Sequence, residues 1–185
     1  TYFSEDFEPT GGTLTQNNAW TTQIVTAHPN GYDWFHSDFN SSAFAKISNY
    51  DNVTSLNSPL ESWLISPQVD LSTATNPTLN FNHTKRFNGT DLAILISTDY
   101  VTGLPSTATW TDLTSMFTMD TDVNSWTFVS SGNLDLSSYI SSSPSTVTIA
   151  FQYLGGTSDG STYEVDDIII NEGGRIDMFD AGGDI

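Results

Sequence analysis

Adjacent carboxylates near the end of the chain are the residues with the clearest potential for chemistry. Asp166 and Asp167 follow one another within residues 163–170, a run that is otherwise rich in Val, Ile and Tyr and therefore typical of a strand. Successive side chains of a strand point to opposite faces, so both faces of this strand mix apolar groups with acid. A carboxylate held among apolar neighbours must be paired, protonated or bound to a metal ion. The alternative is that the acids lie at a strand end and are simply hydrated.

A second group of acids lies at the start of the chain. Three acids occur between residues 5 and 8, on a short predicted strand over residues 2–8, and they repel one another unless something neutralises them. If the first and last strands pair, these acids come to lie beside the acidic pair near the other end of the chain. Ca²⁺ is a hard cation that prefers such oxygen ligands, so we expect a structural calcium ion. The candidate metal ligands are Glu5, Asp6, Glu8, Asp166 and Asp167.

The charge balance limits the partners of the protein. Its 22 acidic and 4 basic residues give a formal net charge of -18, so even complete pairing with Lys and Arg leaves most carboxylates without a basic partner. Divalent cations are then the natural partners of clustered acids, whereas nucleic acids and anionic membranes are repelled. The chain contains no Cys, which excludes disulfides, thiolate metal sites and a Cys nucleophile. Its three His show no ligand spacing, so a transition-metal site is not expected.

Aromatic side chains concentrated in a long loop over residues 28–42 suggest a binding surface. Flat aromatic faces such as that of Trp34 stack on sugar rings, and neighbouring polar groups hydrogen-bond hydroxyls. A basic cluster around Lys85 and Arg86 could hold an anionic group such as a uronate or a sulfate. The alternatives are that the loop folds over one end of the domain and packs on its own aromatics, and that the basic residues only reduce the negative charge of the surface. The candidate ligand-binding residues are Tyr32, Asp33, Trp34, His36, His83, Lys85 and Arg86.

Catalysis has little support in the sequence. No G-x-S-x-G turn accompanies the abundant Ser. A pair of carboxylates could hydrolyse a glycoside. Pairs arise by chance among 22 acids, however, and the most conspicuous pair already has an interpretation as a metal site. We therefore predict that the protein is not an enzyme.

Short strands are the elements that must position these residues. Residues 146–153 alternate between apolar and polar types, and residues 91–97 are apolar on both faces, as in a central strand. Trp63 and Trp126 are expected in strands, with their side chains in the core. No helical pattern of three or more turns occurs, so we predict an all-β fold, a jelly-roll β-sandwich. The predicted strands include residues 19–25, 44–48, 62–66, 78–83, 91–97, 125–129 and 146–153.

Length and composition favour one domain. A chain of 185 residues is long enough for a substantial core, and we predict a domain over residues 1–171. Residues 172–185 are rich in Gly and Asp without alternation and are predicted to be a tail or linker. No apolar run approaches the length of a membrane span, so membrane insertion is not expected. The abrupt start of the chain suggests a domain cut from a longer exported protein.

Motifs spread over residues 2–171 together resemble a known family. In their order they are similar to the choice-of-anchor J domain of Bacteroidetes surface proteins. That domain is similar to the cleaved-adhesin domains attached to secreted bacterial proteases and, more distantly, to MAM domains. The motifs are Glu5-Asp6-Phe7-Glu8, Ser62-Trp63-Leu64-Ile65-Ser66-Pro67, Val69-Asp70-Leu71-Ser72, Ser97-Thr98-Asp99-Tyr100, Ala108-Thr109-Trp110-Thr111, Ser131-Gly132-Asn133-Leu134-Asp135-Leu136-Ser137 and Val165-Asp166-Asp167-Ile168.

The resemblance implies a jelly-roll β-sandwich on an exported, often cell-surface or multidomain, protein. It also implies a structural calcium ion where the first and last strands meet. Carried over by position, Glu8, Asp166 and Asp167 would supply side-chain ligands. One departure is that Tyr163 stands where relatives often place a Trp, which leaves the binding surface undefined.

Two functions stay open at this point. The first is a non-catalytic, calcium-stabilised carbohydrate-binding or adhesion module of an exported bacterial protein. Its partners would be a polysaccharide or a host or cell-surface glycan, together with other domains of the same secreted or surface protein. The second is a structural spacer or protein–protein interaction module without a small ligand. An exposed aromatic platform around Trp34 favours the first function, and an aromatic loop packed inside, with one broad flat face, favours the second.

Overall fold

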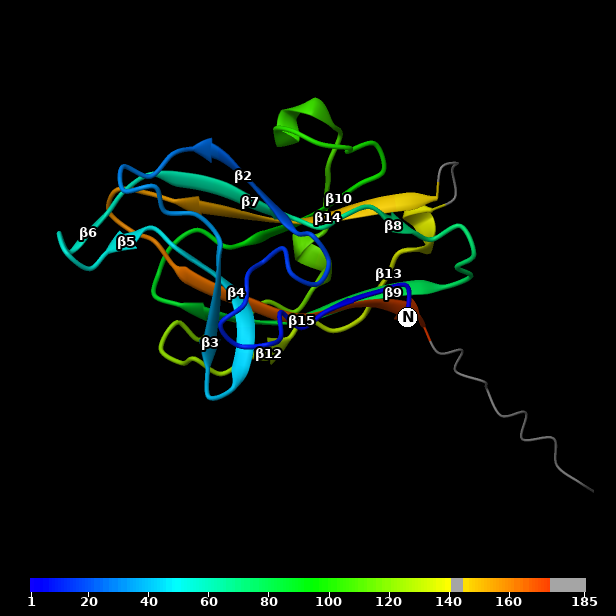
Figure 1. The fold of residues 1–185 in the computed structure, drawn as a ribbon, viewed down its shortest axis with the longest axis horizontal. Helices are drawn as coiled ribbons and strands as arrows, with labels where there is room; N and C mark the ends of the chain where they lie inside the picture. Colours follow the sequence, from blue (N-terminus) through cyan, green and yellow to red (C-terminus); the bar gives the residue numbers. More distant parts are fainter. Residues whose placement is uncertain (141–144, 174–185) are drawn as a thin grey trace, which may run out of the picture.

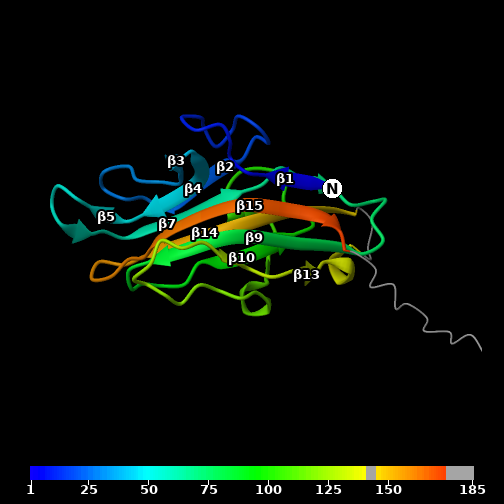
Figure 2. The ribbon, with the colours of Figure 1, turned by 90° about the horizontal axis from the view of Figure 1, so that it is seen from below.

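The computed structural model describes residues 1–140 and 145–173. In these residues two antiparallel sheets pack face to face, as Figure 1 and Figure 2 show from two directions. This confirms the predicted all-β jelly-roll β-sandwich. The helices of this part of the chain are three-residue 3-10 turns, η1 (Pro105–Thr107), η2 (Thr114–Met116) and η3 (Ser137–Tyr139), and none could cross a membrane.

Each sheet has five strands in a continuous order, with shorter strands attached at one end. Sheet A contains β12 (Val129–Ser130), β9 (Pro77–Arg86), β15 (Thr162–Glu172), β4 (Ser42–Ser48) and β3 (Phe35–Phe39), with β1 (Phe3–Glu5) on β15 and β13 (Leu134–Asp135) on β9. Sheet B contains β11 (Thr111–Asp112), β10 (Ala93–Ser97), β14 (Thr146–Gly155), β7 (Leu60–Ile65) and β2 (Thr21–Thr26), with β8 (Val69–Asp70) on β14. A separate two-stranded sheet pairs β5 (Tyr50–Asp51) with β6 (Leu56–Asn57).

The core lies between the two sheets and is rich in aromatic side chains. Phe81 of β9 meets Phe151 of β14 edge-to-face, with 5.2 Å between their ring centroids, and Trp20 also packs against Phe151, with 6.2 Å between their ring centroids. All three side chains are fully buried. The alternation in residues 146–153 sets this arrangement, because it turns every second side chain of β14 toward sheet A.

The two ends of the described chain lie side by side on sheet A. β1 runs antiparallel to β15, with Phe3 opposite Ile170 and Glu5 opposite Ile168. The Tyr2 hydroxyl donates a hydrogen bond to the Glu172 carboxylate at 2.6 Å. β15 therefore continues through Glu172, one residue past the predicted domain boundary. From residue 174 on, the predicted tail lies outside the described residues.

One of the two Trp residues predicted to lie in the core is exposed instead. Only Val129 remains from the predicted strand over residues 125–129, and Trp126 lies in a loop with 46 % of its surface exposed. The reason is that the ring packs on the outer face of sheet A, where the Lys46 ammonium lies 4.7 Å from its centroid. Trp63 lies in β7 and is buried, as predicted, in a smaller core cluster with Tyr100 and Trp110.

Candidate functional site

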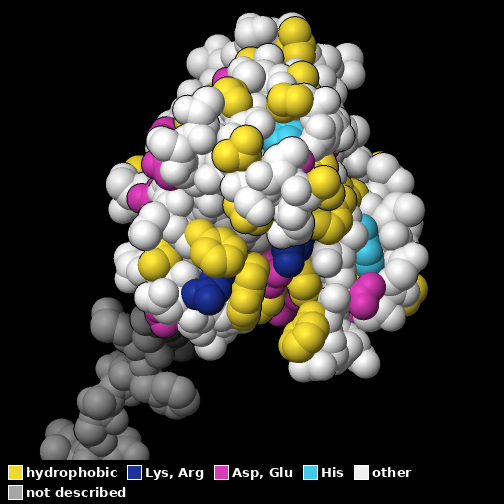
Figure 3. Space-filling view, turned by 90° about the vertical axis from the view of Figure 1, so that its left-hand side faces the viewer, with side chains coloured by type: hydrophobic (Ala, Val, Ile, Leu, Met, Phe, Trp, Pro, Cys, Tyr) yellow, Lys and Arg dark blue, Asp and Glu magenta, His cyan; other side chains and the backbone are white. Residues whose placement is uncertain are grey.

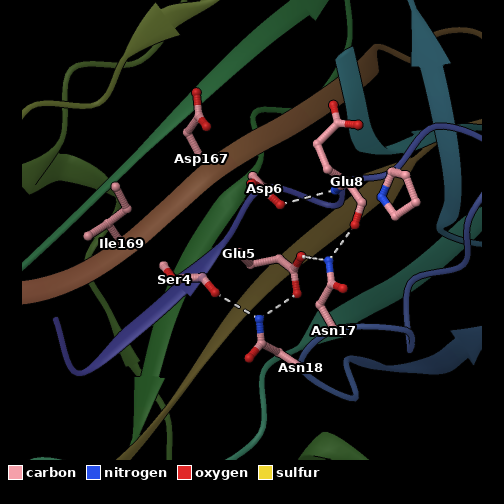
Figure 4. A pocket seen from close by; sticks show the side chains of 9 residues that line it. Ser4, Glu5, Asp6, Glu8, Asn17, Asn18, Asp167 and Ile169 are labelled. Atoms are coloured by element: carbon pink, nitrogen blue, oxygen red, sulfur yellow. Dashed lines mark hydrogen bonds between the residues drawn. The ribbon is translucent and has the colours of Figure 1, made fainter. Parts of the chain in front are cut away.

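Acids from the two ends of the chain line one pocket beside the paired strands β1 and β15. Glu5 is the last residue of β1, and β15 has a register shift between Asp166 and Ile169 in its pairing with β9. Within that irregularity Asp167 has a φ of 50°, a left-handed backbone conformation that redirects its side chain. The resulting acidic pocket has a volume of about 590 Å³ (Figure 4). It is lined by Ser4, Glu5, Asp6, Glu8, Pro9, Asn17, Asn18, Asp167 and Ile169.

Glu5 is buried and its carboxylate is held by three N–H groups. The backbone N–H of Phe7 and the side-chain amide of Asn17 donate to Oε1 at 2.8 and 3.1 Å, and the Asn18 amide donates to Oε2 at 2.8 Å. Figure 4 shows this carboxylate turned toward the two Asn side chains. Glu5 therefore acts as a hydrogen-bond acceptor that ties the first strand to the following loop.

The other acids of the pocket carry single hydrogen bonds from neutral donors. Asp6 accepts from the Glu8 N–H at 3.1 Å, Glu8 accepts from the Ala43 N–H at 2.7 Å, and Asp167 accepts from the Asn82 amide at 2.9 Å. Among residues 1–140 and 145–173 the salt bridges lie elsewhere, between Lys46 and Glu164 and between Lys85 and Asp91. Within the described residues, no basic side chain therefore forms an ion pair with these acids.

Asp166 is the buried member of this group. Burial raises the pKa of its carboxyl to about 7, and the negative charges of Asp167, Asp6 and Glu8 act in the same direction. A hydrogen bond from the Asp167 N–H, at 2.7 Å, opposes the rise only in part. Burial is thus the main cause of the shift, and the charges of Asp6 and Glu8 add to it from the other end of the chain.

The donor set fits a hard cation, but the side chains do not form a finished coordination shell. Across the part of the chain that the structure describes, no three His, Asp or Glu side chains converge in an arrangement that would hold a metal ion. Carboxylates of Asp6, Glu8 and Asp167 line one pocket nevertheless, and carboxylate, amide and backbone oxygens are the ligands that Ca²⁺ uses. An ion bound there would draw the carboxylates inward or take water as additional ligands.

The predicted ligand residues of the long loop are mostly engaged inside the protein. Trp34 is only 4 % exposed, and its indole N–H donates to the Ser62 carbonyl at 3.3 Å. Asp33 accepts hydrogen bonds from the Thr22 hydroxyl, from the Trp34 N–H and from the Ser62 hydroxyl. This corrects the expectation of a stacking platform at Trp34, because the ring faces belong to the core.

Tyr32 and His36 are also held by the protein itself. The Tyr32 ring stacks on His28 with a centroid distance of 4.2 Å and an interplanar angle of 7°, and its hydroxyl donates to Asp51 at 3.2 Å. His36 donates from Nε2 to the Phe7 carbonyl at 2.8 Å. Tyr32 nevertheless lines a hollow on the surface, described below, so part of the loop does reach a candidate binding surface.

The predicted basic cluster does not form. Lys85 and Arg86 are neighbours on β9, so their side chains leave the strand on opposite faces. Lys85 is buried and donates to Asp91 at 2.5 Å and to the Gly89 carbonyl at 3.1 Å. His83 is buried too; burial lowers its pKa to about 4, despite the nearby negative charge of Asp120. Its Nε2 accepts from the Asp120 N–H at 2.9 Å, so His83 has a structural role.

A groove that the sequence did not reveal runs along the outer face of sheet A. It consists of two hollows of about 690 and 370 Å³, a range typical of ligand sites, and Lys46 and Trp126 line both. Figure 3 shows this side of the molecule, with exposed hydrophobic side chains around basic ones. We call it the aromatic groove. Its aromatic lining residues are Tyr32, Trp34, Phe35, Phe39, Phe44, Tyr50, Phe87, Trp126 and Phe128.

Strand alternation supplies part of the aromatic groove. Phe35 and Phe39 project from β3, opposite Lys46 and Ser42 of β4 in the sheet register. Both Phe side chains are exposed, at 47 % and 70 %. The period of two in residues 35–39 could have shown this face, whereas nothing local indicates that a distant loop brings Trp126 to it.

Comparison with known proteins identifies a family and two solved domains that share the fold. Residues 68–178 match the family model described as Domain of unknown function (DUF5017). The K3 and K1 cleaved adhesin domains of Lys-gingipain from Porphyromonas gingivalis W83 align with TM-scores of 0.58 and 0.59 at 18 % and 17 % identity. These alignments cover 93 % and 94 % of this chain and 98 % and 99 % of the two domains. At this identity they show a shared fold. No curated protein sequence matches.

Proposed function

We propose, from the premise that this chain belongs to the DUF5017 family, that it is a non-catalytic carbohydrate-binding or adhesion module of an exported bacterial protein. The observation that carries the proposal is the aromatic groove, five of whose rings are exposed although the chain has a large core: Phe35, Phe39, Tyr50, Phe87 and Trp126. Exposed aromatic faces beside polar groups are suited to stacking on sugars. The cleaved adhesin fold is consistent with a place outside the cell, beside other domains of a larger protein.

The binding proposal is tested with soluble polysaccharides by affinity gel electrophoresis and isothermal titration calorimetry. We expect at least one glycan to bind, and Trp126→Ala to weaken it by tenfold or more, which is about 1.4 kcal/mol. Leu104→Ala is the control, because Leu104 is a half-exposed hydrophobic residue outside the groove. Absence of binding to every glycan in a broad panel would favour the spacer or protein-interaction alternative, which the burial of Trp34 supports.

The same proposal includes a structural calcium ion in the acidic pocket. It is supported by the gathering of Asp6, Glu8 and Asp167 around one pocket and by the charge interaction that reaches Asp166. Mutual repulsion of these acids destabilises the junction of β1 and β15, and a bound cation would remove it. Because Glu5 is buried and its carboxylate already accepts three N–H hydrogen bonds, it is the predicted ligand that the geometry supports least.

Thermal unfolding with Ca²⁺ and with excess chelator tests the calcium proposal. At a free concentration ~100 times the dissociation constant, binding adds about 2.7 kcal/mol, which raises the midpoint by roughly 5–11 °C for a chain of this size. Asp6→Asn and Asp167→Asn should each reduce this calcium-dependent rise. Asp112→Asn, which removes the same charge from exposed β11 of sheet B, should not. A midpoint that chelator leaves unchanged contradicts the proposal.

A further inference from the structure

Lys46 and Trp126 meet across the aromatic groove and divide it into its two hollows. The Lys46 ammonium lies 4.7 Å from the centroid of the Trp126 ring and donates to Glu164 Oε1 at 2.9 Å. Trp126 and Lys46 line both hollows, and Glu164 lines the smaller one. A polar pair therefore stands at the centre of the groove, with aromatic side chains on either side of it.

Charge in the groove is compensated or negative. Among its lining residues Lys46 is the basic one, whereas Asp33, Asp38 and Glu164 are acidic. Arg86 adds a positive charge nearby, with its guanidinium carbon 4.9 Å from the Phe87 ring and 5.9 Å from that of Trp126. The chain as a whole carries a formal charge of -18. A polyanion approaching the groove thus meets repulsion at long range and no surplus of positive charge on contact.

The central pair matches the chemistry of a hydroxyl group. A hydroxyl donates one hydrogen bond and accepts others, while a Lys ammonium only donates and a carboxylate only accepts. Lys46 and Glu164 present both functions side by side, and both are screened from water, Glu164 being buried and Lys46 half-buried. In such surroundings a neutral partner with many hydroxyls is bound without the cost of desolvating another charge.

We infer that the aromatic groove takes an extended chain of uncharged sugars, with the Lys46–Glu164 pair as its central hydroxyl-binding position and aromatic contacts in both hollows. This inference rests on the proposed function and names its ligand class. It reverses the expectation of a uronate or sulfate ligand, since the basic cluster that suggested one is divided between two faces of β9.

The test compares neutral and anionic polysaccharides on the full chain. The probes are a soluble β-glucan, a galactomannan and a xylan against alginate, polygalacturonate and dextran sulfate, each at 50 and 500 mM NaCl. We expect a neutral probe to bind at least tenfold more tightly than any anionic one, with less than a twofold change between the two salt concentrations. Tighter binding of an anionic probe that falls with added salt overturns the inference.

Variants of Glu164 and Asp38 separate this inference from the proposed function. Glu164→Gln should weaken the binding of the neutral probe severalfold. It should also strengthen the binding of polygalacturonate, because it removes a negative charge beside Lys46. Asp38→Asn makes the same charge change without altering the central pair, so it should strengthen only the binding of polygalacturonate. Asp112→Asn, on β11 of sheet B, should change the binding of neither polysaccharide. Anionic binding that Trp126→Ala abolishes would leave the proposed function standing and overturn the inference. Binding of no probe at all overturns both.

Discussion

Replacing Glu5 by Gln removes one charge from the acidic pocket but is expected to destabilise the protein. Glu5 is 3 % exposed, and its carboxylate accepts three N–H hydrogen bonds, from Phe7, Asn17 and Asn18. A Gln side chain has one acceptor oxygen, so it can keep the two bonds at Oε1 while its amide nitrogen opposes the Asn18 donor. The substitution stabilises the fold by lowering the repulsion among the acids and destabilises it by removing a charge-assisted hydrogen bond. The loss of the hydrogen bond should dominate because the side chain of residue 5 is buried.

The magnitude follows from the number of lost bonds. One hydrogen bond to a buried charged group contributes about 2 kcal/mol, so Glu5→Gln should cost about that much. Glu5→Ala leaves all three N–H donors without their acceptor and should lower the free energy of unfolding by about 4 kcal/mol or more. For a chain of this size, each kcal/mol lowers the midpoint of thermal unfolding by roughly 2–4 °C, so the two variants should differ clearly.

Chemical and thermal unfolding in excess chelator measure these costs without any contribution from calcium. Glu8→Gln is the matched control, because Glu8 lines the same pocket, is only half-buried and accepts a single N–H at Oε1, which Gln can replace. We expect a change below about 0.5 kcal/mol for that variant. Equal or greater stability of Glu5→Gln than of the wild type would refute the reasoning, since charge relief would then outweigh hydrogen bonding. A calcium response lost only in Glu5→Gln would instead identify Glu5 as a ligand.

Two further predictions concern residues whose predicted roles the structure changes. Trp34→Ala should destabilise the fold by about 3–5 kcal/mol by opening a core cavity, whereas Trp126→Ala should cost about 1 kcal/mol or less because its ring is half-exposed; urea unfolding measures both, and similar costs would contradict these placements. Stability should also depend on His83, whose pKa falls from 6.5 to about 4 in the fold. Between these values the unfolded chain binds a proton that the folded chain does not, so stability drops as the pH falls, by up to about 3 kcal/mol. The raised pKa of Asp166 has the opposite effect on the pH dependence of stability, but it is the same in wild type and in His83→Gln, so comparing the two proteins isolates the effect of His83. Identical pH profiles would show that His83 makes no such contribution.

The sequence by itself determined the class of fold and the junction of the two ends. The period of two in residues 146–153 identifies the core face of β14, because side chains alternate along any strand. The acids near both ends of the chain were predicted to meet, and β1 does pair with β15 beside them. The separation of Lys85 from Arg86 follows from the same alternation, and it was missed because the strand was predicted to end at residue 83 whereas β9 runs to Arg86.

Only the tertiary structure decided which aromatic side chains are exposed. Trp34 and Trp126 both lie outside strands, yet one is buried against Ser62 and the other rests on Lys46 at the surface. Their positions depend on contacts with β7 and β4, which are distant in sequence, and local patterns carry no information about such contacts. The same holds for the charge of the groove: whether Lys46 is a free cation or the partner of Glu164 depends on a pairing between β4 and β15 that forms only when the sheet closes.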